Sequence, residues 1–208
     1  MSEPGRSATD AIRQDFWNRF ISARPEAFRL ASFFLAYMIG AWTAQLLAQM
    51  PNTGISIWPP SGIFVATLLL TRKSSWGWWV ATALAAELVG NRFWFANPAP
   101  VALLIFAGNA LEALAGAALL RRALGEQPRY DMIGPVLTAI GLCAVAAPAA
   151  GATIGAIALG VAGIQSFQSA WPLFWIGNAT GVLVVAPFML AFAGTGFGGH
   201  WIGSARLV

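Results

Sequence analysis

Long apolar stretches separated by short polar segments dominate this chain. The stretches cover about residues 29–49, 56–71, 76–93, 100–121, 132–157 and 171–192. A helix of about 20 apolar residues is long enough to cross a lipid bilayer. The pattern therefore predicts an all-α integral membrane protein, a bundle of about six transmembrane helices. The second and third stretches are short, so they need their flanking residues to span.

Composition agrees with a membrane protein and excludes several other classes. Of the 208 residues, 58% are hydrophobic and 10% are charged, whereas a soluble domain carries about 25% charged residues. The net charge of +4 is explained by loops that face the cytoplasm, so no nucleic-acid partner is expected. The single cysteine, Cys143, and the single histidine, His200, exclude an internal disulfide, a cysteine metal cluster and a haem with two axial histidines. We expect no cofactor, no metal and no enzymatic activity.

The positive charges predict the orientation of the bundle. If the stretches alternate in direction, every Lys and Arg residue except Arg92 falls on one side of the bilayer. Loops on the cytoplasmic side of a membrane carry the excess of Lys and Arg. Both termini are therefore predicted to be cytoplasmic, and the second stretch is predicted to start outside and end inside.

The ends of the chain differ from its centre. Apolar residues recur at helical spacing over residues 9–22, which predicts a short amphipathic helix on the inner membrane surface, with a flexible tail as the alternative. The chain divides accordingly into a cytoplasmic N-terminal segment (1–28), a six-helix transmembrane domain (29–193) and a Gly-rich cytoplasmic tail (194–208).

Polar residues inside the apolar stretches are the candidates for function, because ionisable groups are costly in a bilayer. Spacing places Asn109 on one helix face with Glu112, and Glu87 on one face with Asn91. We expect these residues to converge in the outer half of the bundle. The candidate ligand-binding residues are Trp58, Glu87, Asn91, Arg92, Asn109, Glu112, Trp175 and Asn178.

Three interpretations of this polar cluster stay open. It can form a pocket open to the outside, where Arg92 and several helix N-termini favour a small anion as ligand. It can instead be interhelical glue, with amide and carboxyl groups bonded across helices to fix their packing. The third interpretation is a path for protons or ions. No catalytic residue is expected.

The segment "WPPSG" (residues 58–62) marks the start of a helix. Trp58 is expected in the aromatic belt at the outer interface. Pro59 and Pro60 fit the first helical turn, where a missing N–H costs nothing. Gly62 allows another helix to approach closely.

Three motifs, "WPPSG", "GNALEALAGAALLRR" and "FWIGNATGVLVVAPFML", resemble the first class of bacterial membrane-associated sensor domains, the MASE type. The resemblance covers roughly residues 30–192. It implies a multi-pass domain of the bacterial inner membrane that belongs to signal transduction, as found at the N-terminus of histidine kinases of two-component systems and of cyclic-di-GMP enzymes. The acidic position that the family has in its last motif is Asn178 here.

The resemblance favours a sensory module that perceives a small ligand or a membrane signal and passes it to a cytoplasmic output domain or partner protein. The first alternative is the substrate-binding membrane subunit of a vitamin-type uptake system, because such subunits are six-span bundles of similar length. The second is a non-catalytic membrane scaffold. The expected partners are the lipid bilayer and the signalling output. Small residues at four-residue spacing serve core packing, with a homodimer face as the alternative.

Overall fold

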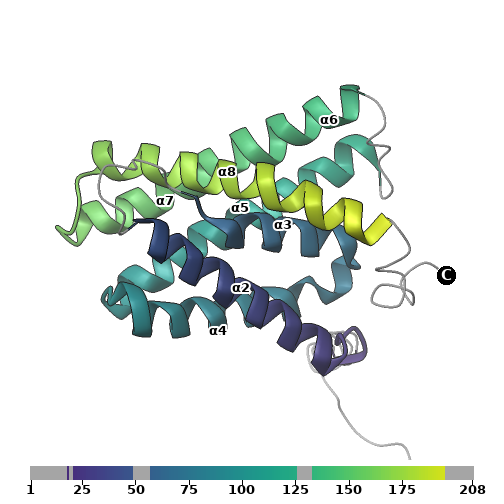
Figure 1. Cartoon of the computed structure of the whole chain (residues 1–208), viewed down its shortest axis with the longest axis horizontal. Helices are drawn as coiled ribbons and strands as arrows, with labels where there is room; N and C mark the ends of the chain where they lie inside the picture. Colours follow the sequence, from purple (N-terminus) through teal and green to yellow (C-terminus); the bar gives the residue numbers. More distant parts are fainter. Residues whose placement is uncertain (1–17, 19–20, 49–56, 126–132, 195–208) are drawn as a thin grey trace, which may run out of the picture.

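The computed structural model of the chain describes residues 18, 21–48, 57–125 and 133–194, and within these ranges the elements are helices running roughly along one axis (Figure 1). The predicted helix over 9–22 and the Gly-rich tail lie outside the described residues, apart from a few positions at their edges. The elements are α2 (Ala27–Ala48), α3 (Pro59–Leu70), η1 (Lys73–Ser75), α4 (Trp76–Gly90), the π-helical η2 (Asn91–Phe95), α5 (Ala99–Leu124), α6 (Ile133–Ala139), the π-helical η3 (Ile140–Ala146), α7 (Ala147–Val161) and α8 (Phe167–Gly194).

Helices overlap every apolar stretch that the sequence analysis predicted to be helical. Four helical segments of the described part are long and apolar enough to cross a membrane: Ala27–Ala48, Ala99–Leu124, Ile133–Val161 and Phe167–Ala193. The third of these is continuous through α6, η3 and α7. Pro59–Leu70 is a shorter apolar helix. The structure therefore supports an all-helical membrane domain with four candidate spans.

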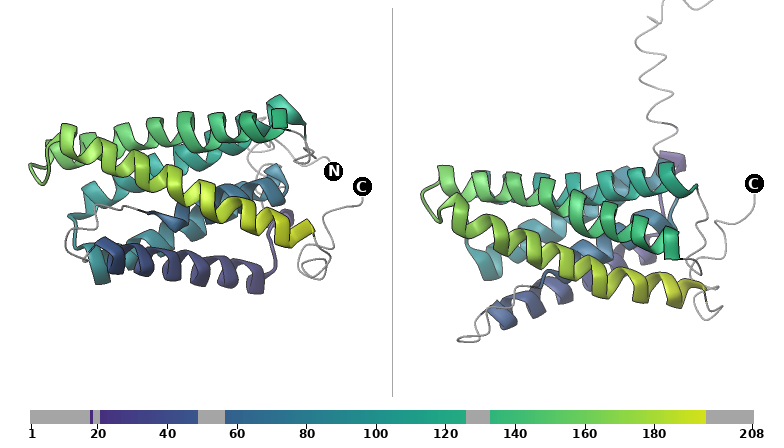
Figure 2. Two further views of the ribbon diagram at one scale, coloured as in Figure 1. Left: turned by 45° about the horizontal axis from the view of Figure 1, so that its top comes forward. Right: turned by 90° about the horizontal axis from the view of Figure 1, so that it is seen from above.

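The short helix α3 occupies the centre of the bundle. It packs against α2, α5 and α8, and every residue from Pro60 to Leu68 is buried. Its 12 residues extend over only about 18 Å, which is less than the roughly 30 Å of bilayer hydrocarbon. In the left view of Figure 2, α3 lies between α2 and α8. It is thus a buried half-length helix in this structure.

The start of α3 lies against α8 inside the bundle, and the place of Trp58 in an aromatic belt stays a prediction. The Trp58 backbone N–H donates to the Gly177 carbonyl at 2.9 Å. Gly177 lies ten residues into α8, which is about 15 Å along that helix. The Pro59-Pro60 pair does begin a helix, as predicted. A sequence motif for a helix start, however, carries no information about depth, and here the start is inside the bundle.

Glycines let two pairs of helices touch backbone to backbone. A Cβ atom added to Gly62 of α3 would collide with the Gly181 carbonyl of α8, and one added to Gly181 would collide with the Trp58 carbonyl. In α5 and α7, a Cβ on Gly108 would lie 2.7 Å from the Gly151 carbonyl. The prediction that small residues serve close helix packing is confirmed at these crossings.

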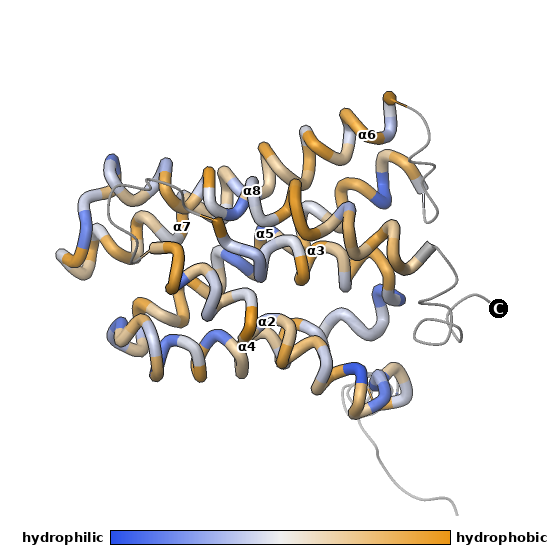
Figure 3. The backbone as a smooth tube through the Cα atoms, in the orientation of Figure 1, coloured by the Kyte–Doolittle hydropathy of each residue, from blue (hydrophilic) through white to orange (hydrophobic). Residues whose placement is uncertain are grey.

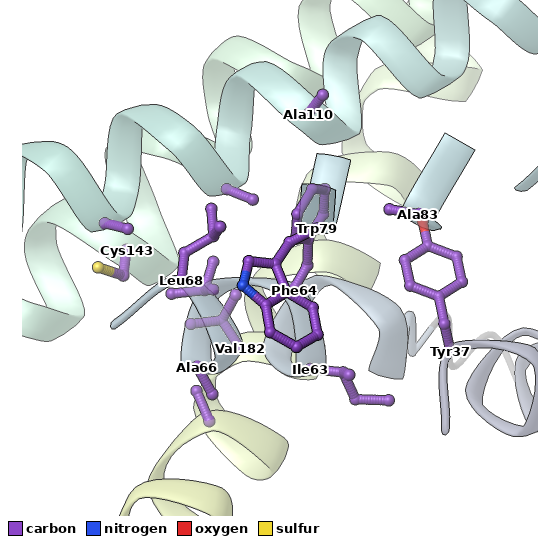
Figure 4. Packing of buried hydrophobic residues seen from close by; sticks show 14 of the residues in the cluster. Tyr37, Ile63, Phe64, Ala66, Leu68, Trp79, Ala83, Ala110, Cys143 and Val182 are labelled. Carbon is purple, nitrogen blue, oxygen red and sulfur yellow. The ribbon is translucent and has the colours of Figure 1, made fainter. Parts of the chain in front are cut away.

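Aromatic side chains fill the core between α2, α3 and α4. The rings of Phe33, Tyr37, Phe64 and Trp79 pack at centroid distances of 5.4–6.4 Å, and Figure 4 shows Tyr37, Phe64 and Trp79 facing this core. Hydrophobic positions extend along the helices in Figure 3, and many large apolar side chains are exposed, Val161 at 85% and Phe188 at 71% among them. Such an apolar exterior suits a bilayer.

Candidate functional site

Two glutamates lie within the bundle, each bonded to a different helix. Glu87, near the end of α4, accepts a hydrogen bond of 2.7 Å from the Tyr37 hydroxyl of α2 at Oε2. Glu112, at the middle of α5, accepts one of 2.5 Å from the Asn178 amide of α8 at its own Oε2. Glu112 has no exposed surface, whereas Glu87 is half-buried. Both carboxyl groups therefore join helices that are far apart in the sequence.

Asn109 and Ser61 connect these two pairs into one polar network. The Asn109 side chain is buried one turn before Glu112 and lies close to Tyr37 and Glu87. The Ser61 hydroxyl of α3 faces the Glu112 carboxyl group. The network thus reaches five helices at mid-height, and its members are Tyr37, Ser61, Glu87, Asn109, Glu112 and Asn178.

Two atoms at the centre of the network are buried and unsatisfied. Neither Glu112 Oε1 nor Ser61 Oγ has a hydrogen-bond partner among the described residues, although each residue is at least 95% buried. No Lys or Arg side chain of the described part is paired with Glu87 or Glu112. An unpaired carboxylate is expensive in a low-dielectric interior. The electrostatics at Glu112 therefore favour a neutral carboxyl group or a bound positive charge.

The end of α3 beside Glu112 offers few hydrogen-bond donors. A helix N-terminus normally presents free N–H groups to an anion. Pro59 and Pro60 have no N–H, and the Ser61 N–H donates to the Trp58 carbonyl at 3.1 Å. The prolines that start the helix thus remove the groups that would bind an anion directly.

The structure brings four of the eight predicted site residues into the network: Glu87, Asn109, Glu112 and Asn178. Trp58 lies nearby, packs on Phe95 at 5.8 Å, and its buried indole N–H has no partner in the part of the chain described here. The positions of the network residues agree with the predicted convergence. Whether these side chains contact a ligand stays a prediction.

The remaining three predicted residues lie in other surroundings. Asn91 exchanges hydrogen bonds with the Asn97 backbone, at 2.9 and 3.2 Å, and so closes the turn between η2 and α5. Arg92 is exposed on η2. The Trp175 indole N–H donates to the Val145 carbonyl at 3.1 Å, within the π-helical η3. These contacts give Asn91 and Trp175 roles in holding the fold together.

Sequence reasoning missed Tyr37 and, as a network member, Ser61. Tyr37 is 1% exposed in the middle of an otherwise apolar helix. A buried tyrosine hydroxyl needs a hydrogen-bond partner, so its position in α2 was the available signal. Ser61 was expected only as a helix-start residue, because its contact with Glu112 depends on how α3 and α5 are packed.

Arg121 forms a second buried polar centre at the other end of α3. Its guanidinium donates to the carbonyls of Leu68, Leu69 and Thr71 at 3.0, 3.0 and 2.6 Å. It also lies over the Trp76 ring, at 5.3 Å from the centroid. The last carbonyls of a helix have no partners within that helix, so Arg121 caps α3. Side chains of α5 therefore lie at both ends of α3: Glu112 faces its first turn, and Arg121 is hydrogen-bonded to its last carbonyls.

The described residues contain no group of three or more His, Cys, Asp or Glu side chains that could hold a metal ion. Residues 29–204 match the model of the protein family described as MASE1. None of the curated proteins and none of the solved structures matches the chain.

Proposed function

The chain belongs to the MASE1 family of membrane-associated sensor domains, and from this premise we propose that it perceives a signal through its buried polar network and passes it to a cytoplasmic output. The single observation that carries the proposal is the network around Glu112. It joins five helices through groups whose bonding changes when a ligand or a proton binds, so occupancy can favour one packing of the bundle over another.

Helix α3 is suited to transmit such a change. Ser61 near its first turn contacts the network, and the carbonyls of its last turn are held by Arg121. A shift at the Glu112 end would therefore be carried along a rigid element to the Arg121 end. Because both contacts come from α5, we propose that the signal changes how α3 packs against α5.

We propose that the Arg121 end faces the cytoplasm of a bacterium, in the inner membrane. Arg72, Lys73, Arg121 and Arg122 gather at this end, and Arg92 lies at the opposite end, as the excess of positive charge on cytoplasmic loops requires. In this orientation both termini are cytoplasmic. With α3 and α4 counted as half-length or short membrane segments, the chain would pass through the bilayer region six times.

The proposed output is a histidine kinase of a two-component system or a cyclic-di-GMP enzyme, fused to this domain or recruited as a partner. The domain itself would be no enzyme. Purification from native membranes in mild detergent, followed by mass spectrometry, tests this. We expect a kinase or cyclase as a fused or copurified component. Copurification of a transport ATPase instead would contradict the sensory proposal and support a substrate-binding subunit of an uptake system.

The network itself is tested in a fusion of the chain to a kinase reporter. We expect Asn109→Ala and Glu112→Gln to change the basal reporter output or abolish its response. Glu26→Gln, at an exposed glutamate whose side chain is 72% exposed, is the matched control. If both network variants fold and signal like the control, the network is not the sensing element.

A further inference from the structure

We propose that Glu112 is a proton-binding site, in which Oε1 carries a proton directed at Ser61 Oγ in the packed bundle. The inference rests on the proposed sensory function for its consequence, because it names the proton as the species whose binding the bundle registers. It replaces the small anion that the sequence suggested as ligand.

The burial of Glu112 disfavours a charged carboxyl group. Glu112 is completely buried at the middle of α5, and the described residues place no Lys or Arg beside it. A small anion would add a second negative charge to this place, at a helix end whose prolines supply no N–H donors. A proton removes the charge that the interior disfavours.

The two oxygens of the Glu112 carboxyl group differ in their hydrogen bonding. Asn178 donates to Oε2, which leaves Oε1 without a partner, and Ser61 Oγ is a free acceptor facing the same carboxyl group. An ionised carboxylate can only accept hydrogen bonds, whereas a protonated one also donates. The Ser61 hydroxyl can donate to an ionised carboxylate or accept from a protonated one. A proton on Oε1 would satisfy both atoms and would also remove the buried charge.

Helix α7 leaves little room beside the Glu112 carboxyl group. A Cβ atom added to Gly151 of α7 would lie 3.0 Å from Glu112 Oε2 and 3.1 Å from Glu112 Cβ. The side of the carboxyl group toward α7 is therefore filled by backbone. A proton needs no cavity, so it fits this packing without any rearrangement of the helices.

Glu87 differs from Glu112 in its exposure and in its hydrogen bonding. It is half-buried and its Oε2 accepts from the Tyr37 hydroxyl, a bond that also suits an ionised carboxylate. The titratable groups close to Glu112 are Tyr37 from α2 and Cys143 from η3. Glu87 of α4 is hydrogen-bonded to the same Tyr37. Helices α3, α7 and α8 contain no titratable residue. None of these titratable groups carries a positive charge that would stabilise an ionised Glu112 carboxylate. Asn178 is its only hydrogen-bond donor among the described residues.

Loss of the proton would reverse the hydrogen bond between Glu112 and Ser61, because only the serine hydroxyl could then donate, and would leave an unpaired charge inside the bundle. The contact between α5 and the first turn of α3 would weaken, while Arg121 would still hold the other end of α3. The deprotonated state is therefore a different packing of α3, and the equilibrium between the two packings depends on pH.

Infrared spectroscopy of the whole purified chain in lipid tests the site directly, because a protonated carboxyl group absorbs apart from carboxylates and amides. We expect a carboxylic-acid band at neutral pH that disappears on alkalinisation. The band should be lost in Glu112→Gln and kept in Glu87→Gln and in the exposed control Glu26→Gln. In Ser61→Ala, which loses only the acceptor, the band should move to higher frequency.

Two results would overturn the proposal: a spectrum without this band at neutral pH, or a band lost in Glu87→Gln and kept in Glu112→Gln. If Glu112→Gln does not fold, an unshifted band in Ser61→Ala overturns it. The infrared band does not depend on signalling, so the two proposals can fail separately. A missing band with a responsive reporter would reject the proton site and leave the sensory function standing. A normal band with a silent reporter would reject the sensory function and leave the proton site standing.

Discussion

Glu112 and Arg121 show how one helix buries two side chains that are normally charged. Both belong to α5 and are at least 92% buried. Arg121 is held by three backbone carbonyls and an indole ring, so its charge is stabilised by groups that α3 leaves unsatisfied at its end. Glu112 is paired with no Lys or Arg side chain of the described residues. The two residues therefore have opposite requirements: a fixed charge at Arg121 and, in our proposal, a proton at Glu112.

Replacing Arg121 should destabilise the protein more than replacing Arg122. In Arg121→Met the carbonyls of Leu68, Leu69 and Thr71 lose a charged donor, and a hydrogen bond to a charged group contributes about 1.5–3 kcal/mol. We expect a loss of about 2–4 kcal/mol, measured as a lower thermal unfolding temperature in detergent. Arg122→Met is the matched control, because Arg122 is exposed. Equal unfolding temperatures of the two variants would contradict the capping role.

Asn178→Ala tests the contact between α8 and α5. The change removes the donor to Glu112 Oε2, so we expect a loss of about 1 kcal/mol, typical of a hydrogen bond between membrane helices. Thr180→Ala is the control, because Thr180 bonds only to the Ile176 carbonyl of its own helix. The two variants are compared by thermal unfolding. If Thr180→Ala is the more damaging change, the bond between Asn178 and Glu112 contributes little.

At the scale of helices, α3 shows what the sequence can and cannot predict. Its apolar content and its Pro-Pro start predicted a helix within 56–71, and α3 spans Pro59–Leu70. Hydropathy records how apolar a segment is, but a helix enclosed by protein and one facing lipid are equally apolar. The depth of α3 depends on its glycine contact with α8, between residues more than a hundred positions apart, and spacing along the chain does not show such a contact.

The same limit applies to the candidate site. Glu87, Asn109, Glu112 and Asn178 were predicted to converge from their helix faces and their depths in the bilayer. The structure places them in one network. Asn91 was included because its spacing puts it on one helix face with Glu87, and Arg92 because it is the only positive charge predicted on the outer side. The π-helical η2 and the left-handed Ala96, with φ of 53°, turn this segment into a loop connection. A local change of helix type is invisible in a pattern of apolar residues.

The crossing of α3 and α8 gives a prediction for whole elements. In Gly181→Ala the new methyl group meets the Trp58 carbonyl, which is backbone and cannot rotate away. The helices must separate, and overpacking of this kind costs about 1–3 kcal/mol. Gly134→Ala is the control, because a Cβ there meets nothing within 4 Å and alanine favours a helix by up to about 1 kcal/mol. Thermal unfolding should show Gly181→Ala less stable and Gly134→Ala unchanged or more stable, and the opposite order would exclude a tight crossing.

At the scale of the whole molecule, the bundle has two chemically different ends. The end that holds Arg121 and Arg122 also holds Arg24 over the Trp78 ring, at 5.8 Å, so the start of α4 and the chain before α2 meet there. The other end has Arg92 on η2. A signal perceived at mid-height has to reach the end that faces the output. The proposal therefore depends on which end is cytoplasmic.

Labelling of single cysteines in intact cells tests the orientation. Cys143 is buried, and Cys143→Ala provides a background without other cysteines. In that background Arg92→Cys should react with a membrane-impermeant maleimide in intact cells. Arg122→Cys, at an equally exposed arginine, should react only after the membrane is permeabilised. Loops with few positive charges are the ones translocated, which gives this order. If only Arg122→Cys is labelled in intact cells, the Arg121 end lies outside the cell. Helix α3 would then carry the signal away from the cytoplasm, and the proposed route to a kinase or cyclase would be wrong.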